Sequence, residues 1–151
     1  MAEFKRILLA EDNADDLELT LAALEESGLA AQVAVVRDGS EALDYLYCRG
    51  SFAGRSTNNP VVLLLDVKMP RVGGIEVLRA VKSDAQLKTL PVVMLTSSRE
   101  AGDVSQSYEL GANAYVVKPV EFTHFAESMR YLGTFWATVN EPPPARAPGR
   151  Q

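Results

Sequence analysis

The chain has 151 residues, a net charge of −5 and a sequence pI near 4.9, with 47% hydrophobic and 23% charged residues. This length suits one domain with a sizeable core, and the acidic balance argues against nonspecific binding to nucleic acid or to an anionic membrane. Cys48 is the single cysteine, which excludes an intrachain disulfide and a cysteine-based zinc site. No apolar run approaches the roughly 20 residues of a membrane span. Glu11 and Asp12 interrupt the first apolar run, so we expect no signal peptide and a cytoplasmic protein.

In chain order, the first apolar run predicts a strand over residues 5–12 that ends in acids. A helix follows, capped by Asn13 and stopped at Gly28, because leucines recur in it at i, i+4 and i+7. Residues 31–36 predict a second strand, and apolar residues at helical spacing over 42–47 predict a second helix.

The run at residues 61–65 is apolar throughout, without polar alternation. This pattern is typical of a strand that is covered on both faces, as in a parallel sheet. The remaining expected elements alternate between helix and strand, at 76–84, 91–96, 99–110, 113–119 and from Phe122 to Val139. We therefore expect one domain over residues 1–140 and a proline-rich, disordered tail over 141–151.

Five strands that alternate with five helices predict an α/β fold. Its form is a doubly wound, five-stranded parallel sheet in the flavodoxin-like order 2-1-3-4-5, with an extended last helix. Ligands of such sheets bind beyond the carboxyl ends of the strands, near the switch point between the first and third strands. The polar side chains at these ends are Glu11, Asp12, Asp66, Thr96 and Lys118.

The three acids Glu11, Asp12 and Asp66 are expected to converge within a few ångströms. Like charges this close repel unless protons or a cation intervene, and a hard divalent cation such as Mg²⁺ prefers oxygen ligands. Lys118 adds a positive charge and Thr96 a hydroxyl donor, which together make a cradle for a phosphoryl group. Asp66 is the candidate nucleophile and would form an acyl phosphate. Each residue alone has a simpler interpretation, such as a helix cap or a turn, but their joint placement at successive strand ends favours phosphoryl chemistry.

The same strand ends carry a family resemblance. Over roughly residues 5–132 the sequence resembles the receiver domain of two-component response regulators. The matching motifs are Glu11-Asp12, Asp66 with Met69-Pro70 and Gly73-Gly74, Thr96, and Lys118-Pro119. The resemblance implies that Asp66 takes a phosphoryl group from the phosphohistidine of a sensor histidine kinase, with Mg²⁺ required, and that the chain is a signalling switch and not an enzyme.

The resemblance also implies a role for each matched residue. The implied metal ligands are Glu11, Asp12, Asp66 and the backbone carbonyl of Lys68. Thr96 and Lys118 bind the phosphoryl group, Thr96 and Tyr115 form the switch pair, and the Lys118–Pro119 peptide bond is expected to be cis. Glu11 departs from the pattern, since aspartate is also common at its position, and the longer acid puts in doubt whether it binds the metal directly or through water.

A narrower resemblance comes from "YLYCRGSF", "SYELGANAYVVKPV" and "FWATV". These segments are similar to small stand-alone regulators that are paired with bacterial phytochromes and tend to form homodimers. The aromatic side chains of the last helix cover more than the one side that a core contact needs. Extra packing within the domain would explain them, but a homodimer interface through the fourth helix, fifth strand and fifth helix is favoured. Phe125, Phe135 and Trp136 are its expected contacts.

The same residues suggest three other functions. A phosphohydrolase of the haloacid-dehalogenase type needs a second acid two residues after the nucleophile, where Lys68 stands. A flavin-binding module needs a hydroxyl- and glycine-rich loop after the first strand, where the acidic "EDNADD" would repel phosphate. A receiver-like scaffold that is never phosphorylated is disfavoured because every phosphotransfer group is present. The output of the switch is then an unknown downstream protein or a phosphorelay, with no nucleic acid or membrane partner.

Overall fold

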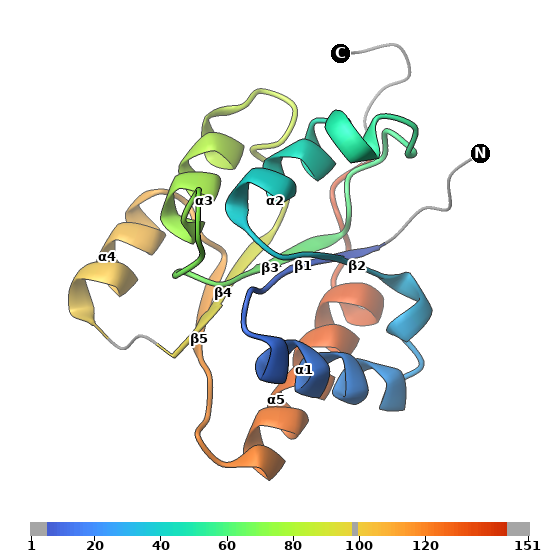
Figure 1. The fold of residues 1–151 in the computed structure, drawn as a ribbon, viewed down its shortest axis with the longest axis vertical. Coiled ribbons are helices and arrows are strands. Elements are labelled where there is room, and N and C mark those ends of the chain that lie inside the picture. The colour runs from blue at the N-terminus through green and yellow to red at the C-terminus, as the bar shows by residue number, and fades with distance from the viewer. Residues whose placement is uncertain (1–5, 98–99, 145–151) are drawn as a thin grey trace.

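The computed structural model describes residues 6–97 and 100–144, which form one parallel sheet between two layers of helices (Figure 1). The five strands are β1 (Ile7–Ala10), β2 (Val33–Val36), β3 (Val62–Leu65), β4 (Val92–Thr96) and β5 (Ala114–Val117). Their order in the sheet is β2-β1-β3-β4-β5, with every neighbouring pair parallel. The predicted fold class and strand order are therefore confirmed.

Five α-helices connect and follow the strands, and none in the described part of the chain is long and apolar enough to cross a membrane. They are α1 (Ala14–Glu26), α2 (Gly39–Leu46), α3 (Gly74–Ser83), α4 (Ala101–Glu109) and α5 (Phe122–Thr134). Short 3₁₀ turns η1 (Ala30–Gln32) and η2 (Gly50–Phe52) precede β2 and β3, and the π-helical turn η3 (Phe135–Val139) continues α5. The last helix thus extends to Val139, as predicted, but its last turn is wider than an α-helix.

Helices α2, α3 and α4 cover one face of the sheet, and α1 and α5 cover the other (Figure 1). Because both faces are covered, the central strands β1 and β3 are buried along their whole length. This explains why residues 62–65 are apolar without interruption. The strand ends are the only places where these central strands can present a polar side chain to solvent.

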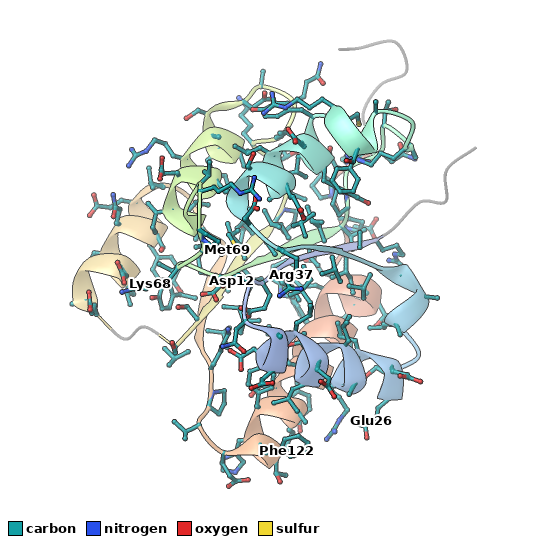
Figure 2. The ribbon with its side chains drawn as sticks, viewed as in Figure 1. Asp12, Glu26, Arg37, Lys68, Met69 and Phe122 are labelled. Atoms are coloured by element: carbon teal, nitrogen blue, oxygen red, sulfur yellow. The ribbon has the colours of Figure 1, made fainter. Side chains whose placement is uncertain are left out.

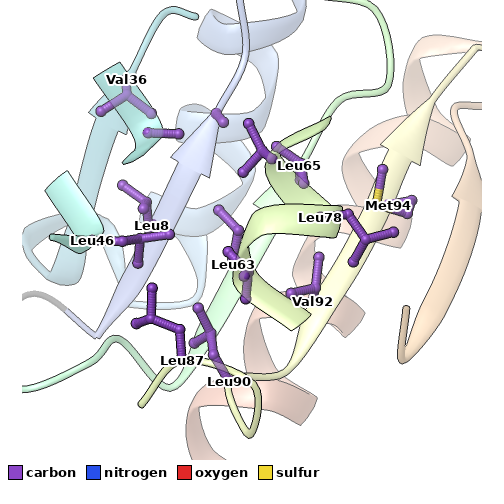
Figure 3. Close-up of a cluster of buried hydrophobic side chains, with 14 of the residues drawn as sticks. Leu8, Val36, Leu46, Leu63, Leu65, Leu78, Leu87, Leu90, Val92 and Met94 are labelled. Carbon is purple, nitrogen blue, oxygen red and sulfur yellow. The ribbon is translucent and has the colours of Figure 1, made fainter. Parts of the chain in front are cut away.

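The core beneath α2 and α3 is the larger of the two apolar layers (Figure 3). Alternate residues of β3 point into it, so Leu63 and Leu65 contact it, while Leu64 points to the opposite layer. From the helical side, Leu78 and Leu46 fill the space over the strands. Each of these leucines is at most 1% exposed, and burying such a side chain contributes about 1.5–3 kcal/mol.

On the other face, α1 and α5 approach each other closely. A Cβ atom at Gly133 would lie 2.4 Å from the Leu24 Cδ2 atom, so only a residue without a side chain fits between the α5 backbone and Leu24. Leu24 and Leu29 pack in the layer that this contact closes, together with Ala137 of η3. The Arg6 side chain donates a hydrogen bond to the Ala137 carbonyl and so ties the start of β1 to the extended last helix.

The predicted disordered tail is described only in part. Pro142, Pro143 and Pro144 line a pocket beside the loops that precede β3 and β4. Residues 145–151 lie outside the described residues, so the disorder of 141–151 and the domain boundary at residue 140 stay predictions.

Candidate functional site

Asp66 follows β3 directly and marks the point where the central strand leaves the core. Its amide continues the sheet pattern by donating to the Ala10 carbonyl of β1 at 3.2 Å. Its side chain accepts a hydrogen bond from the Lys68 amide at 3.4 Å, and the residue is only 8% exposed. The carboxylate is therefore held by the sheet itself, at the edge that solvent reaches.

The start of α3 presses against the backbone of Asp66. A Cβ atom at Gly74 would lie 2.0 Å from the Asp66 carbonyl oxygen, which is far inside contact distance. The Gly74 amide donates to the Val67 carbonyl at 2.8 Å and closes the turn between β3 and α3. Glycine at 74 thus lets the helix begin immediately beside the acid, so this turn places Asp66 as firmly as the strand does.

Glu11 and Asp12 lie at the end of β1, next to β3 in the sheet. Glu11 is 1% exposed, and its Oε2 atom accepts a hydrogen bond from the Asn13 amide at 3.2 Å. Carboxylate oxygens of Glu11, Asp12 and Asp66 lie within 4.8 Å of one another. The Arg37 guanidinium donates to the Asp12 carbonyl at 3.0 Å, and both residues lie near the middle of the molecule in Figure 2. The predicted convergence of the three acids is thus present.

The three carboxylates fit a small divalent cation. Octahedral Mg²⁺ with ligand bonds of about 2.0–2.1 Å places its ligand atoms about 3 to 4.2 Å apart, and the three oxygens lie within 4.8 Å of one another, close to that spacing. Asp12 is half-buried, which leaves room for the water ligands that Mg²⁺ usually keeps. The described residues thus supply the oxygen donors that a hard cation prefers.

Lys118 and Thr96 complete the site from β5 and β4. The Lys118 amide donates to the Thr96 carbonyl at 2.7 Å, so the two strand ends stay in register. Both residues are buried, Thr96 to 1% and Lys118 to 8% exposure. The Lys118 Nζ atom lies 3.4 Å from Asp66 Oδ2 and 2.5 Å from Glu11 Oε1. The fixed positive charge predicted opposite Asp66 is therefore in place.

Asp16 also belongs to the site, although the sequence analysis did not predict it there. Its Oδ2 atom lies 2.8 Å from Lys118 Nζ, closer than Asp66 does. The available signal was positional: Asp16 stands in the first turn of α1, and this turn starts at the same sheet edge at which β1 ends. An acid at this position is readily explained by its favourable interaction with the helix dipole alone, so its ion pair with Lys118 is not expected from the sequence.

Burial and charge shift two pKa values in this cluster. Desolvation raises the pKa of Glu11 to about 7, with Asp66 adding to the rise and the Lys118 ammonium opposing it. Burial by itself would lower the pKa of Lys118, but hydrogen bonds to Asp16 and Glu11 and the charge of Asp66 raise it to about 12. Lys118 therefore stays charged at neutral pH, and Glu11 is partly protonated unless a cation compensates the acids.

Comparison with known proteins decides the family. The model of the response regulator receiver domain matches residues 7–130. The chain belongs to this family.

The relatives of this receiver domain include other response regulators, some of them named for phytochromes. The response regulator Rcp1 of Synechocystis is 34% identical over 132 residues, covering 87% of this chain and 88% of Rcp1. The phosphorylated cyanobacterial phytochrome response regulator RcpA has a TM-score of 0.86 at 37% identity, covering 94% of this chain and 100% of RcpA. The bacteriophytochrome response regulator RtBRR is 60% identical with a TM-score of 0.74, covering 94% of this chain and 86% of RtBRR. One solved form of Rcp1 is Mn²⁺-bound, and receiver domains bind Mg²⁺ or Mn²⁺ at an acidic site of this kind.

Two predictions for the receiver domain are wrong. No peptide bond between the described residues is cis, so the Lys118–Pro119 bond is trans. A prolyl bond itself favours trans by about 0.5–1 kcal/mol, and Lys118 reaches the acids with this isomer. Phe125 was expected on a dimer surface, but it is 3% exposed and packs in the core against Met129 and Leu95.

The predicted dimer role of Phe135 and Trp136 and the predicted switch role of Tyr115 stay predictions. Phe135 is 46% exposed and contacts the half-buried Trp136 ring at 5.1 Å between centroids. Tyr115 is half-buried and packs against the core cluster beneath α2 and α3. The role of the Lys68 carbonyl as a metal ligand stays a prediction.

Proposed function

We propose that this receiver domain accepts a phosphoryl group from a sensor histidine kinase onto Asp66 in a Mg²⁺-dependent reaction. The observation that carries the proposal is the placement of Asp66, whose carboxylate lies among Glu11, Asp12 and the Lys118 ammonium at the solvent-accessible edge of the sheet. A nucleophile held rigidly beside a fixed cation and a metal-binding acid pair is what phosphoryl transfer requires of a protein. The chain would act as a phosphorylated switch, with turnover limited to its own acyl phosphate.

Each residue of the site has a definable part in the transfer. Glu11, Asp12 and Asp66 would hold Mg²⁺ together with the Lys68 carbonyl, and the bound cation would neutralise charge on the phosphoryl oxygens. An Asp66 oxygen forms the new bond to phosphorus while the bond to the donor breaks, and the donor leaves with the electron pair. Lys118 pairs with a phosphoryl oxygen, because its pKa is raised and it stays charged.

Signalling would follow from the Thr96 hydroxyl turning toward the phosphoryl group. Thr96 and Tyr115 stand on neighbouring strands, where Thr96 pairs with Val117 and Tyr115 with Met94. Movement of Thr96 would free space for Tyr115 to turn inward and change the α4–β5–α5 surface. A downstream protein would read this surface, or the phosphoryl group would pass onward in a relay.

The kinase that we propose is a phytochrome-type sensor in the cytoplasm. The support is the similarity to RcpA and RtBRR, whose names tie them to phytochromes. The alignment covers the whole RcpA chain, so the similarity that supports this kinase includes all of that regulator.

The test of the acceptor is the Asp66→Asn variant. Incubation with labelled acetyl phosphate and Mg²⁺ should label the wild type and leave Asp66→Asn unlabelled, because an amide cannot form the acyl phosphate. Asp15→Asn is the matched control: Asp15 is exposed on the first turn of α1, and its variant should label normally. Equal labelling of Asp66→Asn and wild type would refute the assignment of Asp66.

We also propose that the exposed aromatic side chains of the last helix form a homodimer contact. Tyr131 and Phe135 are 70% and 46% exposed, while Trp136 packs partly into the core. Phe135→Ala should therefore weaken a dimer without loosening the core, and Trp136→Ala should also lower stability. Light scattering at tens of micromolar measures the mass, and a monomeric wild type would rule the homodimer out.

A further inference from the structure

We propose that Asp16 is a positioning residue, which holds the Lys118 ammonium in place for phosphoryl transfer to Asp66. This inference rests on the function proposed above and adds a residue to its machinery. Asp16 touches none of the reacting atoms, so its effect must pass through Lys118.

The geometry gives each hydrogen of the Lys118 ammonium one acidic partner. Nζ lies 2.5 Å from Glu11 Oε1, 2.8 Å from Asp16 Oδ2 and 3.4 Å from Asp66 Oδ2. An ammonium group has three N–H donors, so the three acids together define both its position and its orientation. The longest of the three contacts is the one to the proposed nucleophile.

Asp16 differs from Glu11 in where its carboxylate stands. Glu11 belongs to the three-acid cluster that fits a divalent cation, whereas Asp16 is not part of that cluster. If Glu11 held a divalent cation, its hydrogen bond to Lys118 would weaken. Asp16 would then remain as an acidic partner of the ammonium at 2.8 Å, and another N–H donor could follow the oxygens on Asp66.

The first turn of α1 keeps Asp16 ready for this role. The Asp16 amide donates to the Asn13 side chain at 2.9 Å, and its carbonyl accepts from the Thr20 hydroxyl at 2.8 Å. The backbone is thus fixed while the side chain is 31% exposed. Asp15, its neighbour in the same turn, is exposed.

Charge and positioning predict opposite effects of neutralising Asp16. The phosphodonor is an anion, so removing a nearby negative charge should speed its reaction if charge alone mattered. Loss of the hydrogen bond from Lys118 to Asp16 should instead slow the reaction, because a displacement of the Lys118 ammonium by even about 1 Å lowers the rate of phosphoryl transfer strongly. The sign of the change therefore separates the two explanations.

The experiment measures phosphorylation of the full chain by acetyl phosphate at saturating Mg²⁺. An Asp66 oxygen bonds to phosphorus, the bond from phosphorus to the acetate oxygen breaks, and acetate leaves with the electron pair. Asp16→Asn should lower the rate at saturating donor about 10-fold and change the half-saturating donor concentration little. Asp15→Asn should leave both values near wild type, and Asp16→Glu should restore most of the rate because it keeps the charged partner.

A second measurement does not depend on phosphorylation. A double-mutant cycle between Asp16→Asn and Lys118→Met, read by urea unfolding, should show coupled effects, since the contact exists without any ligand. In the kinetic cycle, Asp16→Asn should have no further effect once Lys118 is methionine.

The outcomes distinguish this inference from the proposed function. An unlabelled wild type would overturn both. Normal labelling of Asp66 with an unchanged or faster Asp16→Asn variant, or additive effects in the unfolding cycle, would overturn the role of Asp16 alone.

Discussion

Helices α3 and α4 lie on the same face of the sheet, yet they are attached to it very differently. Helix α3 buries Val77, Leu78 and Val81, each 0% exposed, beside its first residue Gly74. Helix α4 buries only Ser107. One helix is thus anchored by three large apolar side chains and the other by a small polar one.

The difference follows the division of labour proposed for the site. Helix α3 begins against the backbone of Asp66, where any movement would displace the phosphoryl acceptor. Helix α4 follows β4, which ends in Thr96, and packs beside β5, which carries Tyr115. Segments with few buried apolar contacts open and shift at low free-energy cost. The packing therefore predicts that the side around Asp66 is rigid and that the side around α4, proposed above as part of the output surface, moves more readily.

The largest expected effect contrasts one apolar residue from each helix. Leu78→Ala should lower the free energy of unfolding by about 2–5 kcal/mol, because it leaves a cavity in the core. Val104→Ala in α4 should cost less than about 1 kcal/mol, since Val104 is half-buried and makes no part of that core. Urea unfolding followed by the fluorescence of Trp136, the only tryptophan, measures both. Equal losses would show that α4 is anchored as firmly as α3.

The next contrast is between two adjacent glycines at the start of α3. Gly74→Ala should cost about 1–3 kcal/mol or more, because the added Cβ atom would collide with the Asp66 carbonyl. The variant should also phosphorylate slowly, since the collision displaces Asp66. Gly73→Ala is the matched control: its Cβ atom would meet nothing closer than 3.7 Å, and its cost should stay within about 1 kcal/mol. A Gly74→Ala variant with wild-type stability and labelling would contradict the tight turn.

Hydrogen exchange tests the same comparison without any mutation. Amides of α4 should exchange at least about 10-fold faster than amides of α3, because local opening of α4 exposes little apolar surface. Addition of acetyl phosphate and Mg²⁺ should change the protection of α4 and leave that of α3 nearly constant. Mass spectrometry of peptides covering Gly74–Ser83 and Ala101–Glu109 separates the two helices. Identical protection in both would mean that the packing difference has no dynamic consequence.

The sheet was predictable because its strands are short apolar runs that each end in a polar residue. The run at 61–65 carries no alternation, and the parallel, doubly covered sheet that this pattern predicts is the one observed. Strand order and right-handed connections then bring Glu11, Asp12 and Asp66 to one edge. Sequence spacing was sufficient here because strand ends are fixed points of the fold.

Helix surfaces were less predictable for a physical reason. An aromatic residue at helical spacing can face the core or solvent, and only packing decides, so Phe125 proved buried while Phe135 did not. The partner of Asp16 was equally hidden, because Lys118 comes from a strand 102 residues later in the chain. The trans isomer of the Lys118–Pro119 bond was also not predictable, because the two isomers of a prolyl bond differ little in free energy and the spacing of apolar residues does not depend on the isomer.

The smallest expected effect concerns Ser107, the one buried residue of α4. Its hydroxyl oxygen has no hydrogen-bond partner among the residues that the structure describes, and the residue is 0% exposed. A buried polar group without a partner is itself destabilising, so removing it should offset the loss of one small contact. Ser107→Ala should therefore leave the free energy of unfolding unchanged or raise it by up to about 1 kcal/mol. If Ser107→Ala instead lowered the free energy of unfolding by more than about 1 kcal/mol, a bound water would have to satisfy the hydroxyl. A polar contact would then anchor α4, and any mobility of this helix would have another origin.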